Sequence, residues 1–279
     1  MAEYEIKEGV GIIPAGSTEI KDDAFIGCKE LKSVIIPDSV TKIGYYAFRC
    51  CSALTEINIP DSVTEIGGGA FSGCISLKNL VLPDSVTKIG YDAFQACINL
   101  TGIVISESVI SIGSGAFSSI RDLTSITVAA GNKVYDSRDN CNGIIETKTN
   151  TLIAGCKNTV IPATVTRIGS KAFLGCCGLA DLVIPESVTE IGYCAFFGAK
   201  LTSVVISGKV EEIGELAFRD CPELTDVVIG DHVKKIGDDA FVGCAKLTHL
   251  VIGNSVVKIG ERAFSGCSSL KSVIIPESV

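Results

Sequence analysis

The chain has 279 residues, a formal net charge of −8 and a sequence pI near 4.9, with 47% hydrophobic and 20% charged residues. Its 24 basic residues are scattered among 32 acidic ones instead of forming the basic stripe that a phosphate backbone needs, which argues against nucleic acid as a partner. The apolar runs are too short to span a membrane, and the amino terminus MAEYEIKEGVG lacks the basic and then apolar layout of a secretory signal.

An Ala-Phe pair recurs at a fixed spacing along the chain. Its phenylalanines follow one another at steps of 23 residues, apart from single steps of 22 and 56. They are Phe25, Phe48, Phe71, Phe94, Phe117, Phe173, Phe196, Phe218, Phe241 and Phe264. Such a period is typical of a repeat protein in which each unit packs only on its neighbours. We therefore expect one solenoid domain over residues 1–279.

The unit at 31–53, LKSVIIPDSVTKIGYYAFRCCSA, shows what each repeat contributes. Its first apolar residues have strand parity, and Pro37 ends the strand because proline cannot donate to a ladder. After a turn, a short extended return leads to Gly44, which suits a sharp bend or a close backbone approach. The segment YYAFRCCS is too short for an ordinary helix, so we expect a single helical or 3₁₀ turn that carries Phe48 into the interior.

Stacked units would pair their strands in parallel, about 4.8 Å apart. The expected strands are centred near Ile12, Ile35, Asn58, Val81, Val104, Thr127, Val160, Val183, Val205, Val228, Val251 and Ile274. The fold class is therefore an α/β repeat solenoid dominated by strands, with one parallel β-sheet of about 12 strands and very short helical turns.

The period fails in one unit of 33 residues, at 123–155. Its part 129–155 is irregular, without Ile-Gly or Ala-Phe. Apolar pairs at 144–145 and 152–153 flank a polar stretch, which predicts a β-hairpin on the rim or back of the coil. This hairpin is either a protrusion that binds a partner or a tolerated insertion.

The repeat L-x-x-[VIL]-x-[IV]-P-x-S-V-x-x-I-G-x-x-A-F-x-x-C resembles the BspA-like branch of the leucine-rich repeats, over nearly the whole chain. The resemblance implies a right-handed curved solenoid, a single leucine-rich-repeat domain at 1–279, with its parallel sheet on the concave side. It also implies a secreted or bacterial cell-surface protein that binds host or extracellular-matrix proteins. The asparagine that usually follows the strand is absent, and serines such as Ser39 and Ser62 take the comparable turn.

Thirteen cysteines would suggest a disulfide framework in a short secreted chain, but the period explains most of them. Eight lie three residues after a repeated phenylalanine: Cys28, Cys51, Cys74, Cys97, Cys176, Cys221, Cys244 and Cys267. Ile120 and Ala199 fill the same slot, which favours reduced thiols acting as small hydrophobes, although neighbouring coils would bring thiols within disulfide range. No C-x-x-C occurs, so no zinc site, other metal or cofactor is expected.

Strand parity points one residue of each expected strand outward, and most of these residues are aliphatic. This row is a candidate ligand-binding stripe made of Ile35, Val81, Val104, Val160, Val183, Val205, Val228 and Val251. A polar column runs two positions earlier, and Asp181, Asp226 and His249 from it complete the candidate site. An apolar ridge beside varied polar groups suits protein recognition; alternatively, valine is present only because it forms strands well.

The sequence has no nucleophile elbow, H-E-x-x-H or phosphate loop, and no tryptophan to line a sugar cleft. We expect a protein that is not an enzyme but a protein-binding or adhesion scaffold, which recognises its ligand through the concave sheet face. The alternative is a structural spacer or self-assembling rod. It is favoured by the end IIPESV in mid-unit, which suggests a fragment of a longer array or end-to-end association of copies. A glycan-binding protein would need aromatic side chains as platforms for the sugar rings, and this sequence has no tryptophan to provide them.

Overall fold

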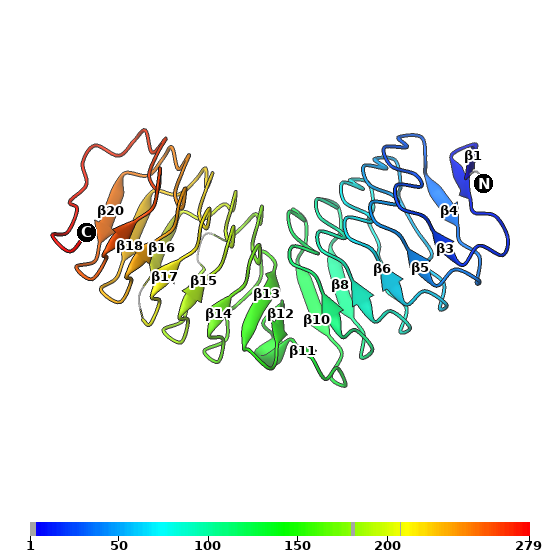
Figure 1. The fold of residues 1–279 in the computed structure, drawn as a ribbon, viewed down its shortest axis with the longest axis horizontal. Coiled ribbons are helices and arrows are strands. Elements are labelled where there is room, and N and C mark those ends of the chain that lie inside the picture. The colour runs from blue at the N-terminus through cyan, green and yellow to red at the C-terminus, as the bar shows by residue number, and fades with distance from the viewer. Residues whose placement is uncertain (1–3, 180–181, 207) are drawn as a thin grey trace. The chain divides into compact units, whose positions relative to one another are not determined.

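The computed structural model describes residues 4–179, 182–206 and 208–279. It forms two compact units, Met1–Asp136 and Ser137–Val279, and the division falls inside the irregular stretch. Within each unit the chain winds as a stack of coils built from short strands and turns (Figure 1). The expected strand-dominated solenoid is therefore confirmed, whereas the assignment of residues 1–279 to one domain stays a prediction.

In the first unit the strands form two columns. The first column contains β2 (Val10–Ile12), β4 (Ser33–Ile35), β8 (Gly102–Ile105) and β10 (Ser125–Val128), and β1 (Glu5–Lys7) pairs antiparallel to β2. The second column contains β3 (Glu19–Ile20), β5 (Lys42–Ile43), β6 (Glu65–Ile66), β7 (Lys88–Ile89) and β9 (Ser111–Ile112), all paired in parallel. The unit ends at β11 (Tyr135–Asp136).

The second unit repeats this plan. It opens with the 3₁₀ turn η1 (Arg138–Asn140) and the antiparallel hairpin of β12 (Gly143–Glu146) and β13 (Thr151–Gly155). Its second column continues from β13 through β14 (Arg167–Ile168), β15 (Glu190–Ile191), β17 (Glu212–Ile213), β19 (Lys235–Ile236) and β21 (Lys258–Ile259). Its first column contains β16 (Ser203–Ile206), β18 (Asp226–Ile229) and β20 (His249–Ile252).

The hairpin expected in the irregular stretch is present, but it lies inside the stack. Ile144, Ile145 and Leu152 are all 0% exposed. Strand β13 pairs in parallel with β14, so the hairpin supplies an ordinary coil of the second unit. The expected position on the rim or back of the coil is therefore wrong, because these apolar pairs are needed to cover the adjacent core.

The single sheet of about 12 strands is replaced by two columns of shorter strands. In the part of the chain that the structure describes, the segments around Asn58, Val81, Val160, Val183 and Ile274 carry no strand. In most coils the second column consists of the isoleucine that follows the turn, usually followed by glycine, and the residue directly before that isoleucine. The sequence predicted a short extended return at this place, but a strand of two residues has no alternation that would mark it as a second strand column.

The segment that carries each phenylalanine is a chain of turns and not the expected helical turn. Tyr46 and Cys50, on either side of Phe48, have left-handed φ values of 54° and 59°. The N–H groups of Phe48 and Cys50 donate to the next coil, while those of Arg49 and Cys51 donate three residues back. Because successive N–H groups alternate between these directions, all four of these groups are satisfied but no helix can form.

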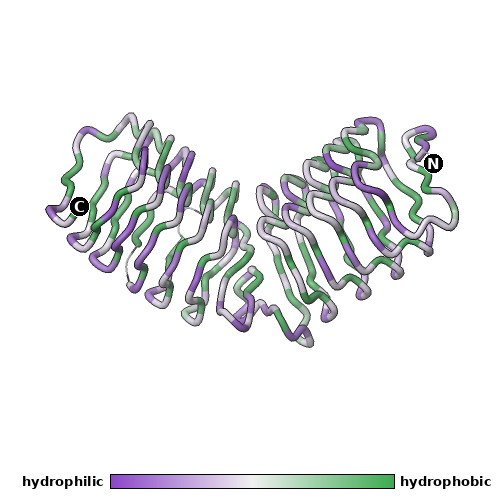
Figure 2. The backbone as a smooth tube through the Cα atoms, viewed as in Figure 1, coloured by the Kyte–Doolittle hydropathy of each residue, from purple (hydrophilic) through white to green (hydrophobic). Residues whose placement is uncertain are grey.

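The core of each unit is built around one column of stacked phenylalanine rings. Neighbouring rings have centroids 5.0 to 5.7 Å apart and lie within 9° of parallel. The Tyr4 ring packs on Phe25 at 5.2 Å, and its hydroxyl accepts the Lys21 N–H. Apolar and polar stretches alternate along the coils (Figure 2), as the repeated inward and outward positions require.

The serine of the turn after the first column forms a hydrogen bond between coils. The hydroxyls of Ser62, Ser85 and Ser187 each donate to a valine carbonyl of the preceding coil, at 2.6 to 2.7 Å. Each bond satisfies a carbonyl at the turn that follows the first column. The serine column is thus a structural feature of the stack.

One buried asparagine closes the last coil of the first unit. Asn132 is 9% exposed, and its Nδ2 donates to the carbonyls of Ser106 and Val109 at 2.8 and 2.9 Å. Its Oδ1 accepts the N–H groups of Val134 and Tyr135 at 2.9 and 2.8 Å. A single side chain thus satisfies two backbone carbonyls of the preceding coil and two backbone N–H groups of the irregular stretch.

We expect Asn132→Ala to lower the free energy of unfolding by about 3 kcal/mol or more, because an unsatisfied buried backbone group costs roughly 1–3 kcal/mol. Urea denaturation followed by circular dichroism measures the change. Asn99→Ala is the matched control, since Asn99 makes one solvent-accessible bond, to the Ile75 carbonyl at 2.7 Å. Equal losses in the two variants would contradict the closing role of Asn132.

Candidate protein-binding face

The first strand column presents alternate side chains to solvent. In β16, Val204 and Ile206 are 4% and 0% exposed, while Val205 between them is 55% exposed. Val205, Val228 and Val251 are register partners in β16, β18 and β20, so their side chains form one row. Strand parity and coil register together therefore place the candidate residues in line.

The outward positions are exposed in both units, as parity predicted. We call these residues the aliphatic stripe: Ile35, Val81 and Val104 in the first unit, and Val160, Val183, Val205, Val228 and Val251 in the second. Their exposed fractions run from 39% at Val228 to 77% at Val81. Asn58 interrupts the stripe in the first unit, whereas five successive coils of the second unit each contribute a valine. Binding by the stripe itself stays a prediction.

Two of the three polar residues predicted beside the stripe lie in contact with each other. Asp226 Oδ1 and His249 Nδ1 lie 3.0 Å apart across β18 and β20, with side chains 50% and 77% exposed. Thr225 donates to Asp226, and Thr248 lies 3.2 Å from His249 Nδ1. The third predicted residue, Asp181, lies outside the described residues. The structure thus places one exposed acid–imidazole pair next to Val228 and Val251.

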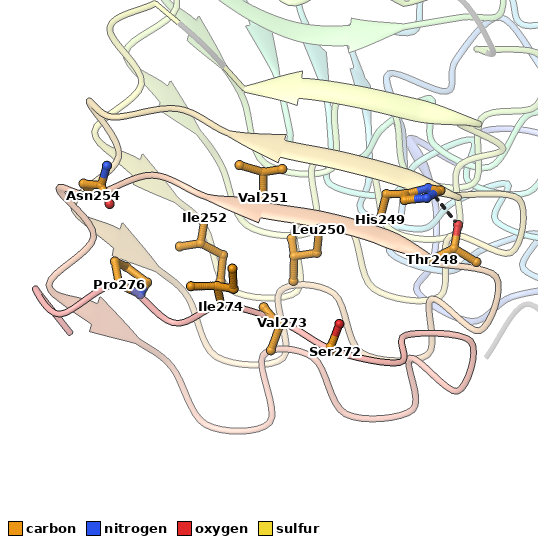
Figure 3. A pocket seen from close by; sticks show the side chains of 10 residues that line it. All are labelled: Thr248, His249, Leu250, Val251, Ile252, Asn254, Ser272, Val273, Ile274 and Pro276. Carbon is orange, nitrogen blue, oxygen red and sulfur yellow. Dashed lines mark hydrogen bonds between the residues drawn. The ribbon is translucent and has the colours of Figure 1, made fainter.

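The stripe of the second unit leads into an apolar pocket of about 420 Å³. Val251 and His249 line it from β20, and Val273, Ile274 and Pro276 line it from the last segment of the chain (Figure 3). Ile274 is 86% exposed. The pocket therefore extends the apolar surface beside Val251.

The second strand column provides an internal comparison for the stripe. Its outward side chains precede the buried isoleucines and are nearly all charged: Glu19, Lys42, Glu65, Lys88 and Ser111 in the first unit, and Arg167, Glu190, Glu212, Lys235 and Lys258 in the second. Neighbouring coils form ion pairs, as between Lys88 and Glu65 at 2.7 Å and between Lys235 and Glu212 at 2.6 Å. The sequence carried this signal as a charged residue before nearly every isoleucine of this column.

The cysteine column belongs to the core. All thirteen cysteines are free thiols. Six of them donate from Sγ to the phenylalanine carbonyl one coil earlier, at 3.0 to 3.2 Å: Cys51, Cys74, Cys97, Cys221, Cys244 and Cys267. Burial raises the pKa of Cys51 and of Cys97 to about 12. These thiols are therefore protonated at neutral pH and unsuited to act as nucleophiles.

Within residues 4–179, 182–206 and 208–279, no three histidine, cysteine, aspartate or glutamate side chains gather closely enough to hold a metal ion. The described ranges also contain no helix with the length and hydropathy to cross a bilayer.

Comparisons with known proteins agree with the fold. A family model described as "BspA type Leucine rich repeat region (6 copies)" matches residues 14–142 and 151–271. A leucine-rich repeat protein of Eubacterium ventriosum, 23% identical, matches with a TM-score of 0.78 over 97% of this chain and 80% of that one. A leucine-rich cell surface protein of Faecalibacterium prausnitzii, 28% identical, matches with 0.62 over 96% and 87%.

The pneumococcal vaccine antigen PcpA is 25% identical and matches with a TM-score of 0.74 over 97% of this chain and 63% of that one. No curated protein matches the sequence.

Proposed function

Because the chain belongs to the family of BspA-type leucine-rich repeat proteins, we propose that it is a protein-binding or adhesion scaffold at a bacterial cell surface, and that the aliphatic stripe contacts its ligand. Repeat proteins of this kind are generally interaction or surface scaffolds and are typically not enzymes. The similarity to a cell surface protein of Faecalibacterium prausnitzii supports the location. At a bacterial cell surface, the partner that we expect is a host or extracellular-matrix protein.

The contrast between the two strand columns carries this proposal. Both columns contain short parallel strands in which an outward residue directly precedes an inward one, so strand propensity acts on both alike. At this outward position the second column nevertheless presents charged side chains in most coils, while the first presents valine or isoleucine in most coils. Water-exposed strands in this protein therefore do not require aliphatic residues. A row of exposed valines beside a polar pair provides apolar contact for affinity and polar groups for selectivity.

We expect the double variant Val183→Lys/Val205→Lys to weaken ligand binding at least about a hundredfold, since each lysine places a charge in the apolar contact and roughly 1.4 kcal/mol corresponds to a factor of ten. The two side chains are 75% and 55% exposed, so folding should persist. Immobilised protein is incubated with plasma and matrix protein pools. Proteins retained by the wild type and lost by the variant are then purified and their dissociation constants measured.

Val257→Lys is the matched control, because Val257 is 61% exposed but lies outside the stripe. The control should bind as the wild type does. Equal binding by all three proteins would contradict the role of the stripe. Light scattering coupled to size exclusion tests the alternative of a self-assembling rod. A wild type whose molar mass rises with concentration, together with a double variant whose molar mass does not, would favour the rod.

A further inference from the structure

Two tyrosines flank a glycine-rich coil at one place in the first unit. Tyr45 and Tyr91 take the position directly after Ile-Gly in coils two apart, and Gly68 takes it in the coil between them. Coils two apart stand roughly 9.6 Å from each other at the spacing of parallel strands. The two ring centroids are nevertheless 6.2 Å apart, at an interplanar angle of 36°. The rings therefore lean toward each other across the glycine coil.

The glycine run between the tyrosines makes this arrangement possible. A Cβ at Gly68 would lie 2.6 Å from the Tyr91 ring, and a Cβ at Gly69 would lie closer still to the Tyr46 ring. The hydroxyls of Tyr46 and Tyr91 are hydrogen-bonded at 3.1 Å, and the Arg49 guanidinium lies 5.2 Å from the centre of the Tyr46 ring. The aromatic cluster is thus held in place before any ligand arrives.

A groove of about 190 Å³ lies beside these rings. Tyr45 and Tyr91 line it, and each is 45% exposed. Glycine backbone also lines it, together with the side chains of Lys42, Glu65 and Lys88 from β5, β6 and β7. Its volume is below the roughly 300–1,000 Å³ of pockets for drug-sized ligands, so it suits a single ring.

The polar side of the groove suits a ligand with hydroxyl groups. Lys88 Nζ donates to Glu65 Oε1 at 2.7 Å, and this hydrogen bond holds the pKa of Glu65 below its usual value. A carboxylate that accepts and ammonium groups that donate can both bond to hydroxyls, which act in either role. Two lysines against one glutamate disfavour a cationic ligand. A proline ring would offer these charged groups no hydrogen bond.

We propose that the groove beside Tyr45 and Tyr91 binds one uncharged pyranose ring of a glycan. The C–H groups on one face of the sugar pack against the tyrosine rings, whose π faces carry partial negative charge. Hydroxyls at the sugar edge bond to Glu65 and Lys88. The groove lies on the second strand column, whereas the stripe lies on the first, so this site does not depend on the proposed protein ligand.

The test uses the whole chain and the methyl glycosides of glucose, galactose, mannose and N-acetylglucosamine at millimolar concentration. Saturation-transfer NMR detects which glycoside binds and which of its faces contacts protein. At least one glycoside should bind, and Tyr45→Ala and Tyr91→Ala should each weaken it at least about tenfold. Tyr91→Phe should retain binding because it keeps the ring. Thermal melting confirms that each variant is folded.

Tyr193→Ala is the matched control, since Tyr193 occupies the same repeat position in the second unit and is also 45% exposed, but without a glycine coil beside it. It should bind as the wild type does. The assignment is overturned if none of the four glycosides binds, if binding survives in both alanine variants, or if a proline-rich peptide occupies the groove in their place. A matched glycoprotein, with and without its glycans, distinguishes an attached sugar from a free one.

Discussion

We expect Gly90→Ala to lower the free energy of unfolding of the first unit by about 3 kcal/mol or more, the upper end of what overpacking costs. A Cβ at this position would lie 2.6 Å from the backbone carbon of Gly67 in the preceding coil. The new Cβ cannot move relative to its own backbone, and the atoms that it meets are backbone atoms of Gly67 and Gly68, so no side-chain rotation can relieve the overlap. The two coils would have to separate, with loss of the hydrogen bond from Gly90 N–H to the Ile66 carbonyl at 2.8 Å.

Gly102→Ala provides the matched control in the same unit. The nearest atom to a Cβ at Gly102 is the Ser125 carbonyl oxygen, 3.9 Å away, and Gly102 is not among the glycines with positive φ. This variant should be neutral, or more stable by about 0.5 kcal/mol, since alanine restricts the unfolded chain. Urea denaturation at a common temperature compares the two. Similar stabilities for both variants would show that close approach of the coils is not what selects glycine.

The same glycine column shows how far sequence reasoning reaches. The Ile-Gly pair suggested either a sharp bend or a close approach, and the period could not choose between them. The structure decides for close approach, because Gly67, Gly113 and Gly214 each face the backbone of the preceding coil. The sequence period shows that glycine recurs at this position. The reason for glycine is the short distance between neighbouring coils, which only the stacked structure provides.

Local conformation was the least predictable level of the fold. Ala-Phe was expected on a single helical or 3₁₀ turn because the segment is too short for an ordinary helix. The structure instead alternates left-handed residues such as Tyr46, Asp92 and Leu216 with right-handed ones, and few of these residue types signal positive φ. Hydrogen bonds to the next coil stabilise this backbone, so tertiary stacking overrides local propensity.

The candidate face was more predictable than the groove. The alternation of inward and outward residues is a property of single repeats, so it correctly gave the exposure of the stripe residues, including Val81, Val160 and Val183, which lie outside strands. The period also aligns Asp226 with His249, which are 23 residues apart and in contact. The tyrosine groove depends on two coils and the glycines between them. The lack of tryptophan suggested that no aromatic platform exists, although Tyr45, Gly68 and Tyr91 carried the signal at one repeat position.

We expect the protein to lose stability steeply between about pH 9 and pH 12, because its buried thiols must stay protonated in the fold. Burial raises the pKa of Cys97 from 9.0 to about 12, and it also raises the pKa of Cys74. Both side chains are 0% exposed and donate to a phenylalanine carbonyl, which a thiolate would only repel.

The loss of stability with rising pH follows from proton linkage. A group with a raised folded pKa contributes its full stability below the unfolded value near 9, and this contribution is lost as pH rises through the window up to the folded value. Each such thiol removes roughly 1.4 kcal/mol per pH unit within that window. Three of them, Cys51, Cys74 and Cys97, should together account for about 4 kcal/mol per pH unit in the first unit.

The triple variant Cys51→Ala/Cys74→Ala/Cys97→Ala isolates this effect from the titration of tyrosine and lysine. Alanine is tolerated in the slot, since Ala199 fills it naturally and is 0% exposed. Urea denaturation with a reductant at pH 8, 9 and 10 should give a markedly shallower decline for the variant than for the wild type. Parallel declines would mean that thiol ionisation does not drive alkaline unfolding, and that the cysteine column is replaceable packing with no proton linkage.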